Sequence, residues 1–107
     1  MTRRWKDEDY ISIVTRRDLP WSARVAQVAH AAMKFADTFD SCIGTEIGSD
    51  PRPVLVYGVD GGEESLDSLR AELNDSGREF VVWREPDMRY ESTALAVNGP
   101  LDHLRLL

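Results

Sequence analysis

Two polar side chains within an apolar stretch are the first candidates for chemistry in this sequence. Gln27 and His30 are three residues apart, a spacing that places both on one face of a helix. An imidazole takes up and releases protons near neutral pH, so His30 is a candidate general acid or base. The alternative is a histidine that braces a neighbouring loop through a hydrogen bond.

Arginines flank the turn that leads into this segment. Arg17 and Arg24 lie on either side of the turn, and Arg84 ends a later apolar run. Guanidinium groups bind phosphates, and the turn from a strand end to a helix start is the usual ligand side of an α/β sheet. Trp21 and Trp83 could stack on a terminal base, or they could pack in the core or its outer shell.

The sequence does not support three other kinds of site. Asp60-Gly61-Gly62 is a turn before a helix and not a glycine-rich phosphate loop. His30 and His103 are far apart and have no second ligand near them, so we expect no metal and no cofactor. Cys42 is the only cysteine and is interpreted as structural, because it cannot form a disulfide within the chain.

Strands and helices are expected to alternate around these residues. The segment 10–15 is rich in β-branched residues and predicts a strand, and a helix is expected from about Ser22 to residues 38–40. The residues of this helix that are expected to face a sheet are Val25, Val28, Ala29, Ala32, Phe35 and Ala36.

Three more strands are expected, at residues 54–59, 80–83 and 93–97. The first of these is a nearly continuous apolar run, as is typical of a strand covered on both faces. A second helix follows it, with an apolar stripe of Leu66, Leu69 and Leu73. Residues 101–107 are expected to form a short tail, with a helix as its candidate structure.

The predicted order is therefore β-α-β-α-β-β. The 107 residues suit a single domain spanning 1–107. Alternating strands and helices predict a three-layer α/β/α fold with parallel pairing. The loop between the last two strands is too short for a helix, so one strand is expected to be antiparallel in a mixed four-stranded sheet.

Composition and charge narrow the class of protein. The chain has a net charge of −6, with a net +2 over residues 1–24 and −8 over the rest. A basic edge on an acidic body could steer a phosphate-bearing ligand, although a solubilising surface explains the charge equally well. The start of the chain, MTRRWKDEDY, resembles neither a signal peptide nor a membrane anchor, so we expect a cytoplasmic protein with no membrane partner.

Motifs at both ends of the chain resemble the type-2 peptidyl-tRNA hydrolases. Segments 17–19 (Arg-Asp-Leu) and 27–32 (Gln-Val-Ala-His-Ala-Ala) are similar to the opening strand and helix of that family. Segments 93–100 (Thr-Ala-Leu-Ala-Val-Asn-Gly-Pro) and 103–107 (His-Leu-Arg-Leu-Leu) are similar to its last strand and its ending. Segment 84–88 (Arg-Glu-Pro-Asp-Met) looks like a compact bacterial or phage-borne branch of the same superfamily.

The resemblance implies a cofactor-free hydrolysis of the ester between a peptide and the 3′ end of tRNA. It implies tRNA or peptidyl-tRNA as partner and a homodimer as one candidate assembly. Its catalytic residues here would be His30, Asp87 and Thr93, with Glu85 competing with Asp87 as the loop acid. Its substrate-binding residues here would be Arg17, Asp18, Arg24, Gln27 and Arg84.

The sequence departs from the family pattern at the start of the first helix. The family has glycine and a lysine that is thought to be catalytic, where this chain has Ser22 and Ala23. Arg24 does not replace the lysine as a base, because a guanidinium stays protonated at neutral pH. The second hypothesis is therefore a binding module on the same fold, which holds an RNA end or a protein without cleaving it.

Overall fold

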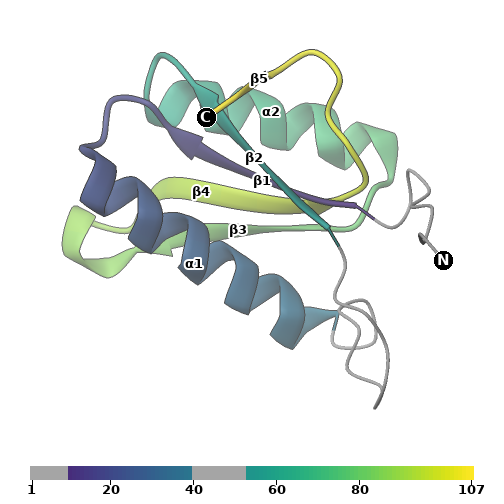
Figure 1. The fold of residues 1–107 in the computed structure, drawn as a ribbon, viewed down its shortest axis with the longest axis horizontal. Coiled ribbons are helices and arrows are strands. Elements are labelled where there is room, and N and C mark those ends of the chain that lie inside the picture. The colour runs from purple at the N-terminus through teal and green to yellow at the C-terminus, as the bar shows by residue number, and fades with distance from the viewer. Residues whose placement is uncertain (1–9, 40–52) are drawn as a thin grey trace, which may run out of the picture.

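A computed structural model describes residues 10–39 and 53–107 of the chain, where one helix lies on each face of a single sheet (Figure 1). The elements in chain order are β1 (Ile11–Arg16), α1 (Trp21–Thr38), β2 (Val54–Val59), α2 (Glu63–Ser76), β3 (Phe80–Glu85), the one-turn 3-10 helix η3 (Pro86–Met88), β4 (Glu91–Asn98) and β5 (Arg105–Leu106). The predicted α/β class is confirmed. Cys42 lies outside the described residues, so its role stays a prediction.

The sheet has five strands in the order β3-β4-β1-β2-β5. Strands β1 and β2 are parallel, and every other neighbouring pair is antiparallel. The mixed sheet was predicted correctly, but the prediction of four strands was wrong. The tail extends as β5 along β2, pairing Leu106 with Tyr57 and Arg105 with Gly58. The helix expected in the tail is absent because this edge of β2 offers its backbone groups to the tail.

Two apolar clusters hold the helices to opposite faces of the sheet. The predicted stripe of α2 is buried against side chains of β1, β2 and β4, with Leu66 and Leu95 almost inaccessible to solvent. On the other face Ala31 and Phe35 of α1 pack against Ile13 and its neighbours from β3 and β4. Neither described helix is long and apolar enough to cross a membrane.

Helix α1 is rotated about its axis relative to the prediction. Its most buried residues are Gln27, Ala31 and Phe35, whereas Val25, expected on the sheet face, is 64% exposed. Ala29, also expected there, is exposed. The prediction was based on apolar periodicity and so placed the polar Gln27 on the outer face. The hydrogen bonds of Gln27 described below explain why it is buried instead.

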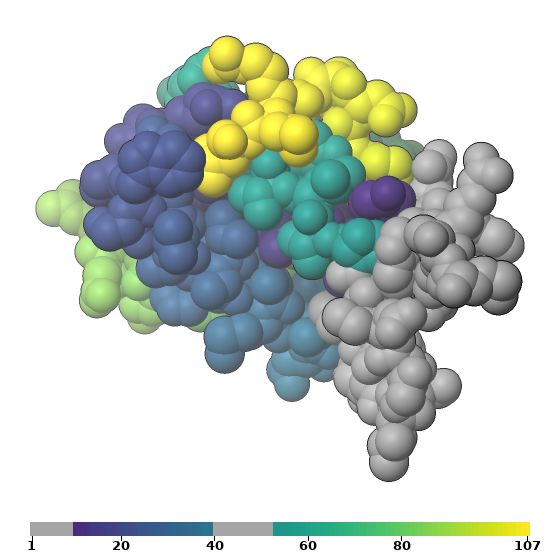
Figure 2. Space-filling view, in the orientation of Figure 1, coloured from purple at the N-terminus to yellow at the C-terminus, as the bar shows by residue number. Residues whose placement is uncertain are grey.

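The α1 face of β2 is only partly covered, contrary to the expectation that helices cover both faces. Val54 is 49% exposed, because α1 packs mainly on β1, β3 and β4. Figure 2 shows α1, β2 and the C-terminal segment side by side on this face. A shallow apolar hollow between them is lined by Trp21, Val25, Val28, Val56 and Leu107.

The Arg17 side chain packs directly over Gly58 of β2. The Arg17 side chain lies so close over Gly58 that a Cβ atom there would come within 2.7 Å of its Nε. The Nη2 atom of Arg17 donates a hydrogen bond to the carbonyl oxygen of Leu106 at 2.9 Å. Arg17 therefore ties β1 to β5 across the glycine.

We expect Gly58→Ala to lower the free energy of unfolding by about 1–3 kcal/mol, because the added methyl group overpacks the Arg17 side chain. Urea denaturation measures this. In an Arg17→Ala background the same substitution is expected to cost much less, since the clashing atoms are gone. An equal loss in both backgrounds would show that the glycine is needed for another reason.

Candidate functional site

A buried hydrogen bond joins the start of β4 to α1. The Thr93 hydroxyl donates to the Gln27 side-chain oxygen at 2.7 Å, and both residues are buried, at 0% and 5% exposed. The Gln27 amide also interacts with the carboxylate of Glu85, the last residue of β3, and helps to lower its pKa.

The direction of the Thr93 side chain depends on an irregularity in β4. The β3–β4 register passes from Trp83 opposite Ala94 to Arg84 opposite Ser92, which leaves Thr93 as an extra, unpaired residue. A β-bulge of this kind re-aims a side chain. Here it allows Thr93 as well as Ala94 to face α1, where Gln27 meets the hydroxyl.

Glu85 is the centre of the site. Its Oε2 accepts a hydrogen bond from the Trp83 indole Nε1 at 2.9 Å, and the carboxylate also receives bonds from Gln27 and from the backbone of Asp87. The Trp83 bond above all, and then these others and the nearby His30, outweigh desolvation and lower the pKa of Glu85 below its ordinary value of 4.5. Glu85 is therefore an anion at neutral pH.

His30 lies beside this anion with its two ring nitrogens in different environments. Nδ1 is buried, 3.5 Å from Glu85 Oε2, and has no hydrogen-bond partner among the described residues. The ring packs on Trp83 with centroids 4.8 Å apart. A carboxylate facing Nδ1 favours the proton on that nitrogen, which leaves Nε2 as the free base.

The exposed part of His30 faces a hollow. The side chain is 40% exposed and lines, with Met33, Lys34, Asp37 and Trp83, a space of about 330 Å³. Lys34 Nζ donates to the Val82 carbonyl oxygen at 2.8 Å, so its ammonium is held at this wall. The site thus combines a histidine, a buried carboxylate behind it and a cation on the same helix.

The structure brings three of the sequence-predicted residues together and separates a fourth. His30, Gln27 and Thr93 belong to one cluster, and Glu85 completes it. Asp87 is an exposed residue of η3, and its contribution to the cluster is a backbone hydrogen bond to Glu85. Of the two competing loop acids, Glu85 is thus the one beside the histidine. The sequence left this choice open because alternation along β3 is hard to follow so close to a proline.

The predicted phosphate-binding arginines have different surroundings. Arg17 is bound to Leu106 as described above. Arg24 donates from Nε to the Leu19 carbonyl oxygen at 2.7 Å and from Nη2 to that of Arg17, and its guanidinium covers the Trp21 ring. Both therefore stabilise the turn between β1 and α1. Arg84 is exposed and makes no side-chain ion pair within the described residues.

Arg16 organises this end of the sheet and was missed as a site residue. It is 6% exposed, and its Nε and Nη2 bind the two carboxylate oxygens of Asp18 at 3.0 and 2.8 Å. Its Nη1 reaches Glu91 Oε1 at 2.8 Å and the carbonyl oxygen of Ser92 at 3.2 Å. The Arg16 bonds lower the pKa of Asp18. Asp18, expected to contact substrate, thus pairs inside the protein; the Arg-x-Asp spacing was the available signal.

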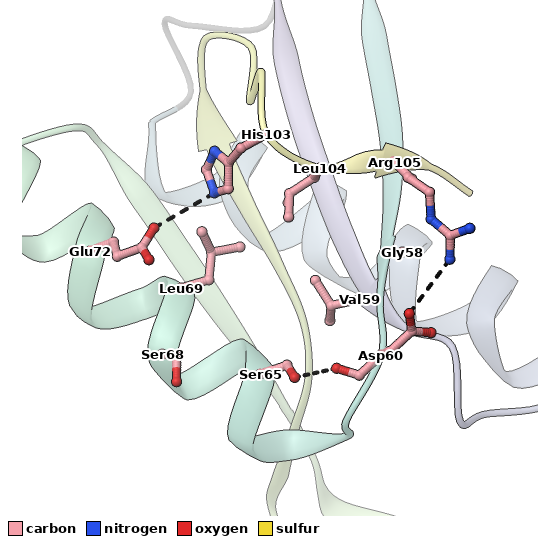
Figure 3. A pocket seen from close by; sticks show the side chains of 10 residues that line it. All are labelled: Gly58, Val59, Asp60, Ser65, Ser68, Leu69, Glu72, His103, Leu104 and Arg105. Atoms are coloured by element: carbon pink, nitrogen blue, oxygen red, sulfur yellow. Dashed lines mark hydrogen bonds and ion pairs between the residues drawn. The ribbon is translucent and has the colours of Figure 1, made fainter.

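A larger hollow, of about 390 Å³, lies between α2 and the C-terminal segment (Figure 3). Its charged groups pair with one another: Arg105 with Asp60 at 3.5 Å, and His103 with Glu72 at 3.6 Å. These side chains are all well exposed, and none is buried and unpartnered. No group of three or more potential metal-binding side chains occurs in the described ranges. The His30 hollow is therefore the better candidate site.

No protein-family model and no curated protein sequence matches this chain. Among solved structures, the fold is similar to that of a protein of unknown function, Atu0240, from Agrobacterium tumefaciens strain C58. The TM-score is 0.69 at 11% sequence identity, covering 92% of this chain and 96% of that one. At this identity the similarity shows the fold alone.

Trp83→Phe tests whether the indole N–H holds Glu85 in its ionised form. The variant keeps an aromatic ring beside His30 but removes the donor, so the folded-state pKa of Glu85 is expected to rise toward its ordinary value. A carboxyl group whose pKa is lowered by folding stabilises the folded state at pH values above its pKa in the unfolded chain. This stabilisation is lost as the pH falls through the pKa of the group in the folded protein. The variant should therefore be less stable than the wild type at neutral pH. Its Glu85 carboxyl group should titrate at a higher pH, which NMR of the carboxyl carbon measures.

Trp21→Phe is the matched control, because Trp21 is 60% exposed and lines a different hollow. It should leave the Glu85 titration unchanged. Identical titrations in wild type and Trp83→Phe would contradict the assigned hydrogen bond.

Proposed function

We propose that this chain is a hydrolase of the type-2 peptidyl-tRNA hydrolase-like class, in which His30 activates water. The observation that carries the proposal is the position of the buried His30 Nδ1, 3.5 Å from the ionised Glu85, on the wall of an open hollow. The Thr93–Gln27 hydrogen bond beside this carboxylate supports it, since Gln27, His30 and Thr93 are positions at which the chain resembles that family.

The proposed reaction needs no cofactor. His30 Nε2 removes a proton from a water molecule, and the oxygen adds to the ester carbonyl carbon. The C–O bond to the ribose then breaks, and the ribose oxygen leaves with the proton held by the imidazolium. The products are the free peptide acid and tRNA with its terminal hydroxyl restored.

Glu85 and Lys34 have supporting roles in this scheme. The Glu85 carboxylate stabilises the imidazolium and keeps the proton of the resting histidine on Nδ1. Lys34 lies four residues after His30 in the same hollow, and its ammonium has two N–H groups beyond the one bound to Val82. These N–H groups can stabilise the negative oxygen formed at the carbonyl. Lys34 thereby supplies a positive charge on the helix that has Ala23 at its start.

His30→Ala and Glu85→Gln are each expected to reduce peptide release from peptidyl-tRNA at least tenfold, about 1.4 kcal/mol in activation free energy. Purified N-blocked aminoacyl-tRNA is a suitable substrate, with release followed by acid precipitation. His103→Ala is the matched control, since His103 is exposed and pairs with Glu72 on the other side of the sheet. Wild-type rates in both site variants would refute the role of the dyad.

A binding module without catalysis is the second candidate, and Ala23 is the observation that favours it. The position is half-buried in the first turns of α1, two turns before His30 on the same side of the helix. Ala23→Lys is expected to raise the hydrolysis rate, by placing a second ammonium near the dyad. If the wild type binds tRNA without turnover and the lysine variant gains turnover, the protein is a binding module that has retained the fold. An unchanged rate in an active enzyme would mean that this position is not needed here.

A further inference from the structure

Asp37 is a carboxylate without a balancing charge on the wall of the His30 hollow. It shares one side of α1 with the other helical residues of the hollow, His30, Met33 and Lys34, which lie seven, four and three residues before it. Asp37 is exposed and makes no ion pair within the described residues. Lys34 does not neutralise it, because the Lys34 ammonium is held at the Val82 carbonyl oxygen, at 2.8 Å.

The position of Asp37 is unfavourable for the helix itself. Helix α1 ends at Thr38, and its last turn contains no basic residue. The carboxyl end of a helix carries a partial negative charge, which favours cations and disfavours a carboxylate. Because Asp37 adds a full negative charge at this place, this end of the hollow attracts a cation. A residue that opposes the local electrostatics and lacks a partner within the described residues is expected to serve a contact outside the domain.

The charges along α1 match those of one reaction intermediate. Glu85 behind His30 is ionised, so two carboxylates stand against the Lys34 ammonium around the hollow. Addition of water to the carbonyl of an aminoacyl ester creates a negative oxygen, and the neighbouring carbon carries the positive α-ammonium. Lys34 and Asp37 have opposite charges one turn apart on the helix. The ammonium of Lys34 can therefore stabilise the negative oxygen while the Asp37 carboxylate binds the α-ammonium.

The spacing of His30 and Asp37 limits how far such an ammonium can lie from the ester. The two residues are two turns apart, about 10.5 Å along the helix axis. Water bonded to the imidazole, the carbonyl carbon that it attacks, and an α-nitrogen bonded to a carboxylate span about 11 Å end to end. In a peptide, an ammonium one residue further on lies about 3.5 Å farther away. Asp37 therefore fits an ammonium on the esterified amino acid itself.

We propose that Asp37 selects esters whose acyl group is a single amino acid with a free α-ammonium. The Trp83 ring and the 68% exposed Met33 provide apolar surface in the hollow for the side chain of that amino acid. This inference rests on the proposed function and narrows the acyl group that the site prefers. An N-blocked ester is a poorer substrate, because its amide nitrogen carries no charge for Asp37 to bind.

The test compares three esters of one tRNA: phenylalanyl-tRNA, N-acetylphenylalanyl-tRNA and glycylphenylalanyl-tRNA. Acid precipitation gives kcat/KM for release of the acyl group, with the spontaneous hydrolysis of each ester subtracted. The wild type should favour phenylalanyl-tRNA over each of the other two by at least about fivefold. Asp37→Asn should lower this preference to less than about twofold, through slower hydrolysis of phenylalanyl-tRNA, because the amide does not attract the ammonium.

Asp75→Asn is the matched control. Asp75 is an exposed carboxylate near the end of α2, on the other face of the sheet, and its substitution changes the net charge by the same amount. It should keep the wild-type preference. An equal loss of preference in both variants would assign the effect to net charge and overturn the inference.

Thermal melting separates a role in binding from a role in stability. Asp37→Asn should melt at or above the wild-type temperature, because it removes a negative charge from the carboxyl end of α1. A clearly lower melting temperature would show that Asp37 stabilises the fold and would overturn the inference.

The inference and the proposed function fail in different ways. If the wild type hydrolyses all three esters equally, or prefers the N-acetyl ester, the inference is overturned and the hydrolase stands. The same conclusion follows if Asp37→Asn keeps the wild-type preference. If the wild type accelerates the hydrolysis of none of the three esters, the hydrolase is refuted, and the inference falls with it.

Discussion

The burial of one glutamine determines how the first helix lies on the sheet. A primary amide removed from water loses several hydrogen bonds, and leaving them unmade is costly, so Gln27 can be buried only where partners meet it. The Thr93 hydroxyl and the Glu85 carboxylate provide these partners from two different strands. Their positions require α1 to turn Gln27 inward, and the same rotation leaves Val25 exposed.

This rotation also sets the geometry of the candidate site. His30 follows Gln27 by three residues, so with Gln27 turned toward the sheet, the imidazole lies at the margin of the helix–sheet contact, beside Glu85 and Trp83. One ring nitrogen is then enclosed while the rest of the side chain reaches the hollow. The indole N–H and the Gln27 amide keep Glu85 ionised and hold it in place. A general base needs this combination of a fixed orientation and an open face.

A second group of polar residues, centred on Arg16, stabilises the same end of the sheet but is not part of the candidate site. Arg16 binds Asp18, Glu91 and the backbone of Ser92, and so connects the end of β1 to the start of β4 just before Thr93. The guanidinium is nearly inaccessible to solvent, and a buried charge of this kind persists only when it is fully paired. Both acids keep part of their side chains exposed, at 45% for Asp18 and 39% for Glu91, while the arginine between them is enclosed.

The sequence alone determined the α/β class, the order of the first two helices and four strands, and the apolar stripe of α2, because periodicity and residue type are local properties. It also predicted Gln27, His30 and Thr93 as site residues, a prediction based on resemblance. It did not determine the fifth strand, since two residues pair with β2 only when a distant edge is available. It did not reveal the rotation of α1 or the choice of Glu85 over Asp87, because both depend on hydrogen bonds between residues far apart in the chain. Nor did it show that Arg17 and Arg24 are engaged while Arg84 makes no ion pair within the described residues, since a charged side chain acquires its partners only when the strands and helices are packed together.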